Sequence, residues 1–265
     1  MRELFTMWRH SRMVMLVAVV AAIYAAVLIP FKFITIIPGI TSVRPANVFP
    51  VIFSIMFGPA APWGAAIGNL IGDVFGGTLG PGSAFGFLGN FFFGFLGYKL
   101  WGNLGPLSSG EEPRMDSLHQ IVEYVVIAIT ASTACAAIIA WGVDLLGLVP
   151  FGILGVTISI NNSLAAVVLG PPLLYLTYPR IKEIGLLYPD IMREEELQSF
   201  DFAQPTVAAF VVVAVSIAWV VAGIYVLPPG STMQMAVGAV GLGLLILAAL
   251  AGSQALPDQM RRAGA

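Results

Sequence analysis

Charged residues are scarce in this sequence: Asp, Glu, Lys and Arg together make up 10% of its 265 residues. Charged residues make up about a quarter of a typical soluble domain, so this chain has too few of them to cover a surface that faces water. Apolar residues make up 58%, and the mean hydropathy is +0.91. A net charge of −2 without a basic stripe also excludes a nucleic-acid partner, which requires cations against its phosphates. The composition therefore predicts a protein whose main solvent is lipid.

Residues that carry catalysis or bind metals are equally few. The one cysteine, Cys135, cannot form an internal disulfide and lies in a long apolar run, where we expect inert packing. The two histidines, His10 and His119, lie far apart, so no metal-ligand set can be assembled within the membrane. No Gly-x-x-x-x-Gly-Lys-Ser/Thr motif is present, which excludes ATP hydrolysis through a P-loop. A membrane enzyme acting on lipids is disfavoured because its acid–base groups are missing. We predict a non-enzyme without metal or cofactor of its own.

The apolar residues form continuous runs, whereas the strands of a membrane β-barrel alternate apolar and polar residues. Continuous runs of about 20 residues suit helices that cross roughly 30 Å of hydrocarbon. We interpret the first run as a retained helix, because no clear cleavage site of a signal peptide follows it. The sequence predicts an all-α polytopic membrane protein with eight transmembrane segments: 13–29, 46–58, 60–78, 84–101, 120–146, 152–178, 205–227 and 233–253.

The positive charges predict the orientation of these segments, because cytoplasmic loops are enriched in Lys and Arg. With a cytoplasmic N-terminus and eight crossings, ten of the twelve Lys and Arg residues lie inside. Only Lys32 and Arg44 lie outside. We therefore predict a multi-pass protein of the cytoplasmic membrane with both termini in the cytoplasm.

The chain divides into three regions. Residues 1–180 contain the first six segments, and residues 205–265 contain a C-terminal transmembrane hairpin and a tail. Residues 181–204 form an acidic cytoplasmic linker, with a short surface helix expected around the run Glu194-Glu195-Glu196. The outer loop 30–45 is strongly apolar, and we expect it to fold over the helix ends because an apolar loop in bulk water is costly.

Polar side chains gather at one depth of the predicted bundle. Asn69 and Asp73 lie four residues apart on one helical face, and glycines at four-residue spacing on the same helix, such as Gly64 and Gly68, allow another helix to approach closely. Polar groups inside a bilayer are costly, so a cluster in its outer half predicts a pocket under the 30–45 loop. The candidate substrate-binding residues are Arg44, Asn47, Asn69, Asp73, Asn90, Trp141, Asn161 and Asn162.

The same residues also have purely structural interpretations. Asp73 would then pair with Arg44 or Lys32 to close the bundle, and the asparagines would form ordinary interhelical hydrogen bonds. Trp141 lies at interfacial depth, where tryptophan is common in any membrane protein. Glu123, near the inner end of its segment, is interpreted as snorkelling to the interface or facing a partner.

Several local patterns follow one another in the first 180 residues. An alanine-rich first helix (16–26) precedes the apolar loop, which ends in Arg44-Pro45-Ala46-Asn47-Val48-Phe49-Pro50. The turn Met56-Phe57-Gly58-Pro59 then leads into a helix rich in glycine and alanine that reaches Asp73. In these features residues 13–180 resemble the substrate-binding S components of energy-coupling factor (ECF) vitamin transporters.

The resemblance implies a six-helix bundle that binds a small molecule near the outer surface, with the 30–45 loop as a lid. It also implies docking onto a transmembrane scaffold subunit that carries two cytoplasmic ATPases, which would be the subunits that use ATP. The matching small residues of the first helix are Ala18, Ala22 and Ala26, whose alternative role is packing within the bundle. Metal-transporting relatives use an N-terminal histidine, so Met-Arg-Glu-Leu at positions 1–4 disfavours nickel or cobalt. The C-terminal hairpin departs from the six-helix pattern.

These observations support two hypotheses of different classes. The first is a membrane-embedded substrate-binding subunit of an ECF-type importer for a vitamin or similar small polar organic molecule, such as a modified-base precursor. The alternative is a non-catalytic membrane scaffold subunit of an envelope complex, in which the polar groups satisfy one another. A cavity of a few hundred cubic ångströms at the level of Asn90 and Asn161 would discriminate between them.

Overall fold

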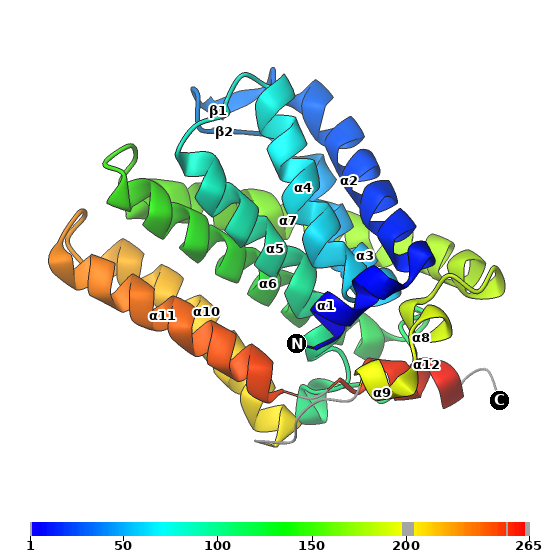
Figure 1. Ribbon diagram of the computed structural model, residues 1–265. Helices are drawn as coiled ribbons and strands as arrows, with labels where there is room; N and C mark the ends of the chain where they lie inside the picture. Colours follow the sequence, from blue (N-terminus) through cyan, green and yellow to red (C-terminus); the bar gives the residue numbers. More distant parts are fainter. Residues whose placement is uncertain (1, 198–203, 253, 263–265) are drawn as a thin grey trace.

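The computed structural model describes residues 2–197, 204–252 and 254–262, and it is almost entirely α-helical (Figure 1). Parts of the predicted linker (198–203) and of the predicted tail (263–265) lie outside the described residues. Short helices at the N-terminus and in the linker accompany the long ones, and one small hairpin of two strands is present. The elements are α1 Glu3–Thr6, η1 Met7–Arg9, α2 Ser11–Phe31, β1 Thr35–Ile37, β2 Thr41–Ser42, η2 Pro45–Val48, α3 Phe49–Phe57, α4 Ala60–Phe75, α5 Gly82–Leu100, η3 Gly105–Leu107, α6 Leu118–Leu145, α7 Phe151–Glu183, α8 Tyr188–Ile191, α9 Glu194–Leu197, α10 Pro205–Tyr225, α11 Thr232–Ala251 and α12 Leu256–Arg262.

Each of the eight predicted apolar segments coincides with a long or medium helix, with boundaries shifted by a few residues. Among the described residues, five helical stretches are long and apolar enough to cross a membrane: those that contain α2, α6, α7, α10 and α11. The helix α3 is short, and α4 and α5 carry many glycines. Eight crossings therefore remain a prediction, whereas the all-α fold with several membrane-spanning helices is confirmed.

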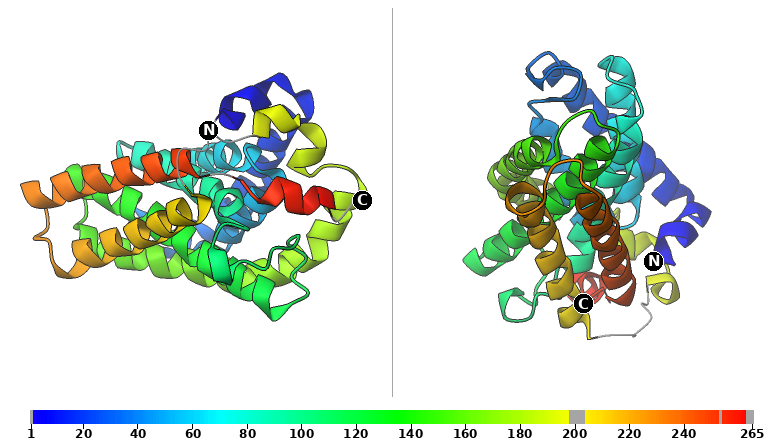
Figure 2. Two further views of the ribbon diagram at one scale, coloured as in Figure 1. Left: turned by 90° about the horizontal axis from the view of Figure 1, so that it is seen from below. Right: turned by 90° about the vertical axis from the view of Figure 1, so that its left-hand side faces the viewer.

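The helices α2 to α7 form one bundle in which sequence neighbours pack together: α2 lies against α4, α4 against α5, α5 against α6, and α6 against α7. The C-terminal pair α10 and α11 packs mainly against α6, and α10 also contacts α7. Figures 1 and 2 show this pair on the side of the bundle away from α2. A hydrogen bond of 3.2 Å from the Gly230 amide to the Asp144 carboxylate fastens the outer turn of the pair to the end of α6. The extra hairpin therefore leaves the first helix uncovered.

The glycines of α4 bring it into close contact with α2, as their spacing predicted. A Cβ atom on Gly68 would lie 2.9 Å from the carbonyl oxygen of Ala21, and one on Gly64 would overlap a methyl carbon of Val20. Backbone atoms cannot yield as a flexible side chain does, so only glycine permits this separation at position 68. The close approach fixes the position of the polar residues farther along α4.

Gly68→Ala is expected to destabilise the bundle by about 1–3 kcal/mol, because the added methyl group overpacks the contact between α2 and α4. Thermal unfolding of the purified protein in detergent would measure the change. Gly243→Ala on α11 is a matched control, since a Cβ atom there meets nothing within 4 Å. Equal melting temperatures for the two variants would contradict the assigned role of Gly68.

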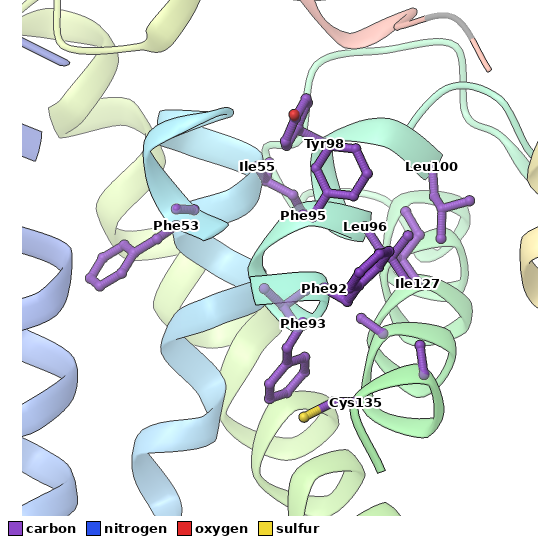
Figure 3. Packing of buried hydrophobic residues seen from close by; sticks show 14 of the residues in the cluster. Phe53, Ile55, Phe92, Phe93, Phe95, Leu96, Tyr98, Leu100, Ile127 and Cys135 are labelled. Atoms are coloured by element: carbon purple, nitrogen blue, oxygen red, sulfur yellow. The ribbon is translucent and has the colours of Figure 1, made fainter. Parts of the chain in front are cut away.

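The apolar core lies at the crossing of α3, α5 and α6. Figure 3 shows Phe92, Phe93 and Phe95 of α5 packed between Phe53 on one side and Ile127 on the other. Cys135 is buried at one margin of this cluster, as its apolar surroundings predicted. Close packing in this region gives the polar end of the bundle a rigid base.

Buried ion pairs and hydrogen bonds close the opposite end of the bundle. The Nζ atom of Lys99 lies 3.1 Å from an oxygen of Glu3, and both side chains are less than 5% exposed. The carboxylate of Glu123 is fully buried and accepts hydrogen bonds from the amides of Gly102 and Ser109 at 2.7 and 2.8 Å. The interpretation of Glu123 as snorkelling or facing a partner is therefore wrong: its charge is used to hold the loop between α5 and α6.

The linker contains two short helices, α8 and α9, rather than one. The Glu196 carboxylate lies 2.7 Å from the ring of His10, so the acidic run contacts the N-terminal segment. Burial acts to raise the pKa of Glu196, but hydrogen bonds from the Arg193 amide and from His10 outweigh it and hold this pKa below its ordinary value. The linker is thus tied to the start of the chain.

Candidate functional site

A cavity of about 300 Å³ lies at the end of the bundle where the polar residues were predicted to gather. Its walls come from α4, α5, α6, α7, the turn between α4 and α5, and the loop 30–45, which we call the lid. Polar and apolar groups share the lining, with the apolar part supplied mainly by Ile139, Val143, Leu148 and Ile158. Five of the eight candidate substrate-binding residues line this main cavity: Arg44, Asn69, Asp73, Asn90 and Asn162.

Arg44 enters the main cavity from the end of the lid, just before η2. One of its terminal nitrogens donates a hydrogen bond of 2.8 Å to the side-chain oxygen of Asn69. Its Nε atom is buried and has no hydrogen-bond partner among the described residues. The Nε atom is sealed from the cavity, so it is the rest of the Arg44 side chain that contributes to the lining.

Asp73 forms an ion pair with Lys32, as one of the two interpretations of its sequence position predicted. The Lys32 Nζ atom lies 2.8 Å from one Asp73 oxygen and 3.0 Å from the hydroxyl of Thr78, while Asn69 donates to the other oxygen at 3.3 Å. Burial and the nearby Arg44 charge lower the pKa of Lys32, and the bond to Asp73 opposes this shift. Asp73 therefore both lines the main cavity and fastens the base of the lid.

A buried network of amides and one hydroxyl forms the floor of the site. The Tyr24 hydroxyl lies 2.7 Å from the side-chain oxygen of Asn47 and 2.9 Å from that of Asn90. Asn90 also donates to the Gly86 carbonyl at 2.8 Å, and Asn47 donates to the side-chain oxygen of Asn162. Asn47 is 1% exposed and lies behind the wall, so it orients Asn162 directly and Asn90 through Tyr24 rather than lining the cavity.

Asn161 faces the lid instead of the main cavity. Its amide donates a hydrogen bond of 2.9 Å to the Ser42 carbonyl and accepts one of 3.3 Å from the Arg44 amide. The two adjacent asparagines of α7 thus divide their roles, since Asn162 lines the cavity and Asn161 holds the lid down. Sequence alone did not separate these two roles.

Trp141 does not line the main cavity, so the structure gives no support to its selection as a substrate-binding residue. Its indole N–H donates to the Met235 carbonyl at 3.2 Å, and its ring packs edge-to-face on Phe85 and Trp219. A Cβ atom on Gly238 would overlap this ring. Trp141 therefore fastens α10 and α11 to the bundle, a role that required knowledge of the hairpin's position.

The lid forms a small antiparallel hairpin, in which Thr35 pairs with Ser42 and Ile37 with Thr41. Ile40 and Thr41 line the main cavity, as expected of a loop that covers the helix ends. The expectation that the whole loop folds down was too broad, because Phe33 is 89% exposed and Ile34 and Ile36 also point outward. The lid thus has an inner face that mixes polar and apolar residues and an outer face that is apolar.

The alanine stripe of α2 lies on the outside of the bundle. Ala18, Ala22 and Ala26 are exposed, whereas Ala21 and Ala25 are buried against neighbouring helices. The alternative that the exposed three pack within the bundle is therefore wrong. The same exposed side of α2 also carries Val14, Met15, Val19 and Ile23. Small residues such as the three alanines permit another helix to approach closely within a membrane.

Sequence reasoning missed two further polar residues of the site, Tyr24 and Thr78, and named Lys32 only as a partner of Asp73. Tyr24 stands alone among apolar residues in the first helix, and a buried hydroxyl there requires a partner. This isolated hydroxyl was a signal in the sequence that could have identified Tyr24. Cys135 was assigned to packing, yet it also lies in the cavity wall.

A membrane bundle with a polar cavity at one end, a lid above it and a first helix with an uncovered face of small residues is the arrangement expected of a substrate-binding S component of an ECF-type transporter. The comparison with family models agrees: the model described as "QueT transporter" matches residues 14–179. The chain belongs to the QueT transporter family, a family of ECF-type S components. It is thus a multi-pass membrane protein that binds a small molecule and associates with an ECF module. No curated protein and no solved structure matches the chain.

Proposed function

We propose that this chain captures a queuosine precursor, the substrate class of its family, in the main cavity and delivers it to its transporter module. The observation that carries the proposal is the cavity of about 300 Å³ lined by Arg44, Asn69, Asp73, Asn90 and Asn162. Ligand pockets range from about 300 to 1,000 Å³, so this one suits a single heterocyclic base.

The chemistry of the lining fits such a base. Queuosine is a 7-deazaguanine nucleoside, so its precursor bases have flat apolar faces and an edge with both donors and acceptors. The asparagine amides donate and accept, the Arg44 guanidinium donates, and Asp73 accepts. Ile139, Val143 and Ile158 supply apolar surface for the faces of the ring. A vitamin of similar size and polarity is the broader class to which this ligand belongs.

The transport role rests on a docking arrangement that we also propose. The exposed Ala18, Ala22 and Ala26 would contact a transmembrane scaffold subunit, and two cytoplasmic ATPases attached to that subunit would hydrolyse ATP. Eight crossings in the cytoplasmic membrane, with both termini in the cytoplasm, follow from the distribution of positive charge. In this arrangement residues 1–180 form the capture bundle, 181–204 the linker, and 205–265 the hairpin and tail.

The scaffold hypothesis expects the polar groups to be locked against one another without a void. Several are indeed paired, such as Asp73 with Lys32, but the cavity of about 300 Å³ beside them favours capture of a ligand.

Binding by the purified full-length chain in lipid nanodiscs tests the proposal. We expect 7-deazaguanine derivatives to bind in calorimetry, and thiamine, a vitamin of different shape and charge, to serve as a non-binding control. Mass spectrometry of ligands released by denaturation should detect a deazapurine. Absence of any deazapurine binding, together with tight binding of an unrelated compound, would overturn the proposed substrate.

A further inference from the structure

A single hydroxyl hydrogen faces two acceptor oxygens in the buried network beneath the main cavity. The Tyr24 hydroxyl lies 2.7 Å from the side-chain oxygen of Asn47 and 2.9 Å from that of Asn90. A hydroxyl has one O–H donor, and an amide oxygen only accepts. As the amides are placed, one of the two oxygens therefore faces the hydroxyl without a hydrogen between them. All three side chains are at most 2% exposed, so bulk water cannot supply the missing donor.

The backbone fixes the orientation of the Asn90 amide. Its nitrogen donates a hydrogen bond of 2.8 Å to the Gly86 carbonyl. Turning this amide over would place its oxygen against the Gly86 oxygen, and both atoms only accept. The Asn90 oxygen therefore stays toward Tyr24 and receives the one hydrogen of the hydroxyl. The Gly86 carbonyl thus sets the direction of the hydrogen bonds farther along the network.

The amides of Asn47 and Asn162 can turn over together. The oxygen and nitrogen of an amide are so alike that a half turn exchanges them without displacing neighbours. After the half turn, Asn47 donates an N–H to the Tyr24 oxygen, and its own oxygen faces Asn162. Asn162 then donates to Asn47 across the contact that already joins the two amides. Every donor from Asn162 to the Gly86 carbonyl then meets an acceptor.

The direction of this network decides which atom Asn162 presents to a ligand. Asn162 lines the main cavity, whereas Asn47 lies behind its wall. The amide atom of Asn162 that does not bond to Asn47 is therefore the one on the cavity side. Cys135 lies beside it in the lining. A thiol is both a weak donor and a weak acceptor, so it holds the amide in neither orientation.

We propose that Asn162 presents its oxygen to the main cavity and thereby selects a ligand that carries an N–H or O–H group at that place. Tyr24 is the positioning residue that sets this direction, although it does not line the cavity. The inference rests on the proposed function and adds the polarity of the base edge that this wall accepts. A ligand with an acceptor at the same place would set two acceptors against each other.

Three analogues of 7-deazaguanine test the direction of the network by calorimetric titration of the chain in nanodiscs. The first, 7-deazaxanthine, carries an oxygen in place of the exocyclic amino group, and the furopyrimidine analogue carries an oxygen in place of N9–H. Each replaces a donor of the base by an acceptor. At least one of these two should bind the wild-type chain roughly tenfold or more weakly than 7-deazaguanine. The third analogue, 3,7-dideazaguanine, lacks only the acceptor N3, where 7-deazaxanthine gains a hydrogen.

Tyr24→Phe removes the hydroxyl, so Asn47 and Asn162 can take either orientation. The ratio between the affinities of 7-deazaguanine and the weakly bound oxygen analogue should then fall toward one, because Asn162 can turn its N–H toward the added oxygen. Asn162→Ala should lower the same ratio, since it removes the opposing oxygen. A ratio compares two ligands on one protein, so a smaller folded fraction does not alter it.

Tyr124→Phe is the matched control. Tyr124 is fully buried, its hydroxyl bonds to the Ala166 carbonyl, and it lies outside the cavity lining. This variant should keep the wild-type ratio for every analogue.

The outcomes separate this inference from the proposed function. Equal affinity of the wild-type chain for 7-deazaguanine and both oxygen analogues overturns the inference, as does a ratio that Tyr24→Phe leaves unchanged or that Tyr124→Phe lowers equally. A ratio for 3,7-dideazaguanine that changes in Tyr24→Phe also overturns it, because Asn162 would then present its nitrogen to N3. In these cases 7-deazaguanine still binds and the proposed function stands. Failure of 7-deazaguanine and all its analogues to bind overturns the proposed function and this inference with it.

Discussion

Arg44→Met should weaken binding of the substrate by roughly 10- to 150-fold. Hydrogen bonds to charged groups contribute about 1.5–3 kcal/mol, which corresponds to that range of dissociation constants. Arg44 belongs to the cavity lining, and the variant removes its guanidinium group. The variant also leaves the Asn69 side chain without the hydrogen bond of 2.8 Å that orients it in the cavity. Calorimetric titration of the purified protein measures the effect.

Two further variants show whether the loss of affinity arises from the side chain of Arg44 in the main cavity. Arg44→Lys keeps the charge but lacks the planar fork of donors, so its affinity should fall between those of the wild type and Arg44→Met. Arg180→Met removes a cation whose side chain is 83% exposed and whose pairing with Glu183 is weak, and it should bind as the wild type does. Wild-type affinity in Arg44→Met would remove Arg44 from the proposed substrate contacts.

Ala22→Trp should reduce substrate uptake by cells at least tenfold while leaving substrate binding by the purified chain unchanged. Ala22 lies in the middle of the exposed alanine stripe of α2. The residues that line the main cavity all lie outside α2. Within lipid, association of helices depends on close packing of small residues. An indole in the centre of this face would hold a partner helix away from the stripe.

The C-terminal pair of helices provides a matched control for that experiment. Ala214 is an exposed alanine of α10, on the side of the bundle formed by α6 and α7. Ala214→Trp should permit normal uptake and normal co-purification with the ATPase module. If both variants transport normally, the stripe is not the docking surface; if both fail, the C-terminal pair also takes part in the assembly.

Much of the fold was predictable because each feature depends on local sequence. Continuous apolar runs predicted the eight segments that coincide with helices in the structure. The spacing of Gly64 and Gly68 predicted a close contact between two helices. The depth of the polar cluster also followed from position along each helix. Five of eight selected residues consequently line one cavity.

The rotation of each helix was harder to predict. A membrane helix that is apolar on all sides has no periodic pattern that marks its inner face. Asn161 and Asn162 are adjacent, yet only the packing of α7 against the lid and η2 gives them different partners. The selection of Trp141 as a candidate substrate-binding residue has the same cause, since the sequence gives no indication that α11 lies beside it.

The sequence by itself determined that this is an all-α membrane protein with its polar groups near one end, because hydropathy and the cost of buried polarity act along the chain. The tertiary structure alone decided which of those groups face a void and which satisfy one another. It paired Lys32 with Asp73, left the Nε–H of Arg44 unpaired, and placed the lid beside the turn after α4. Such distinctions depend on the orientation of helices about their own axes, which contacts between distant segments fix.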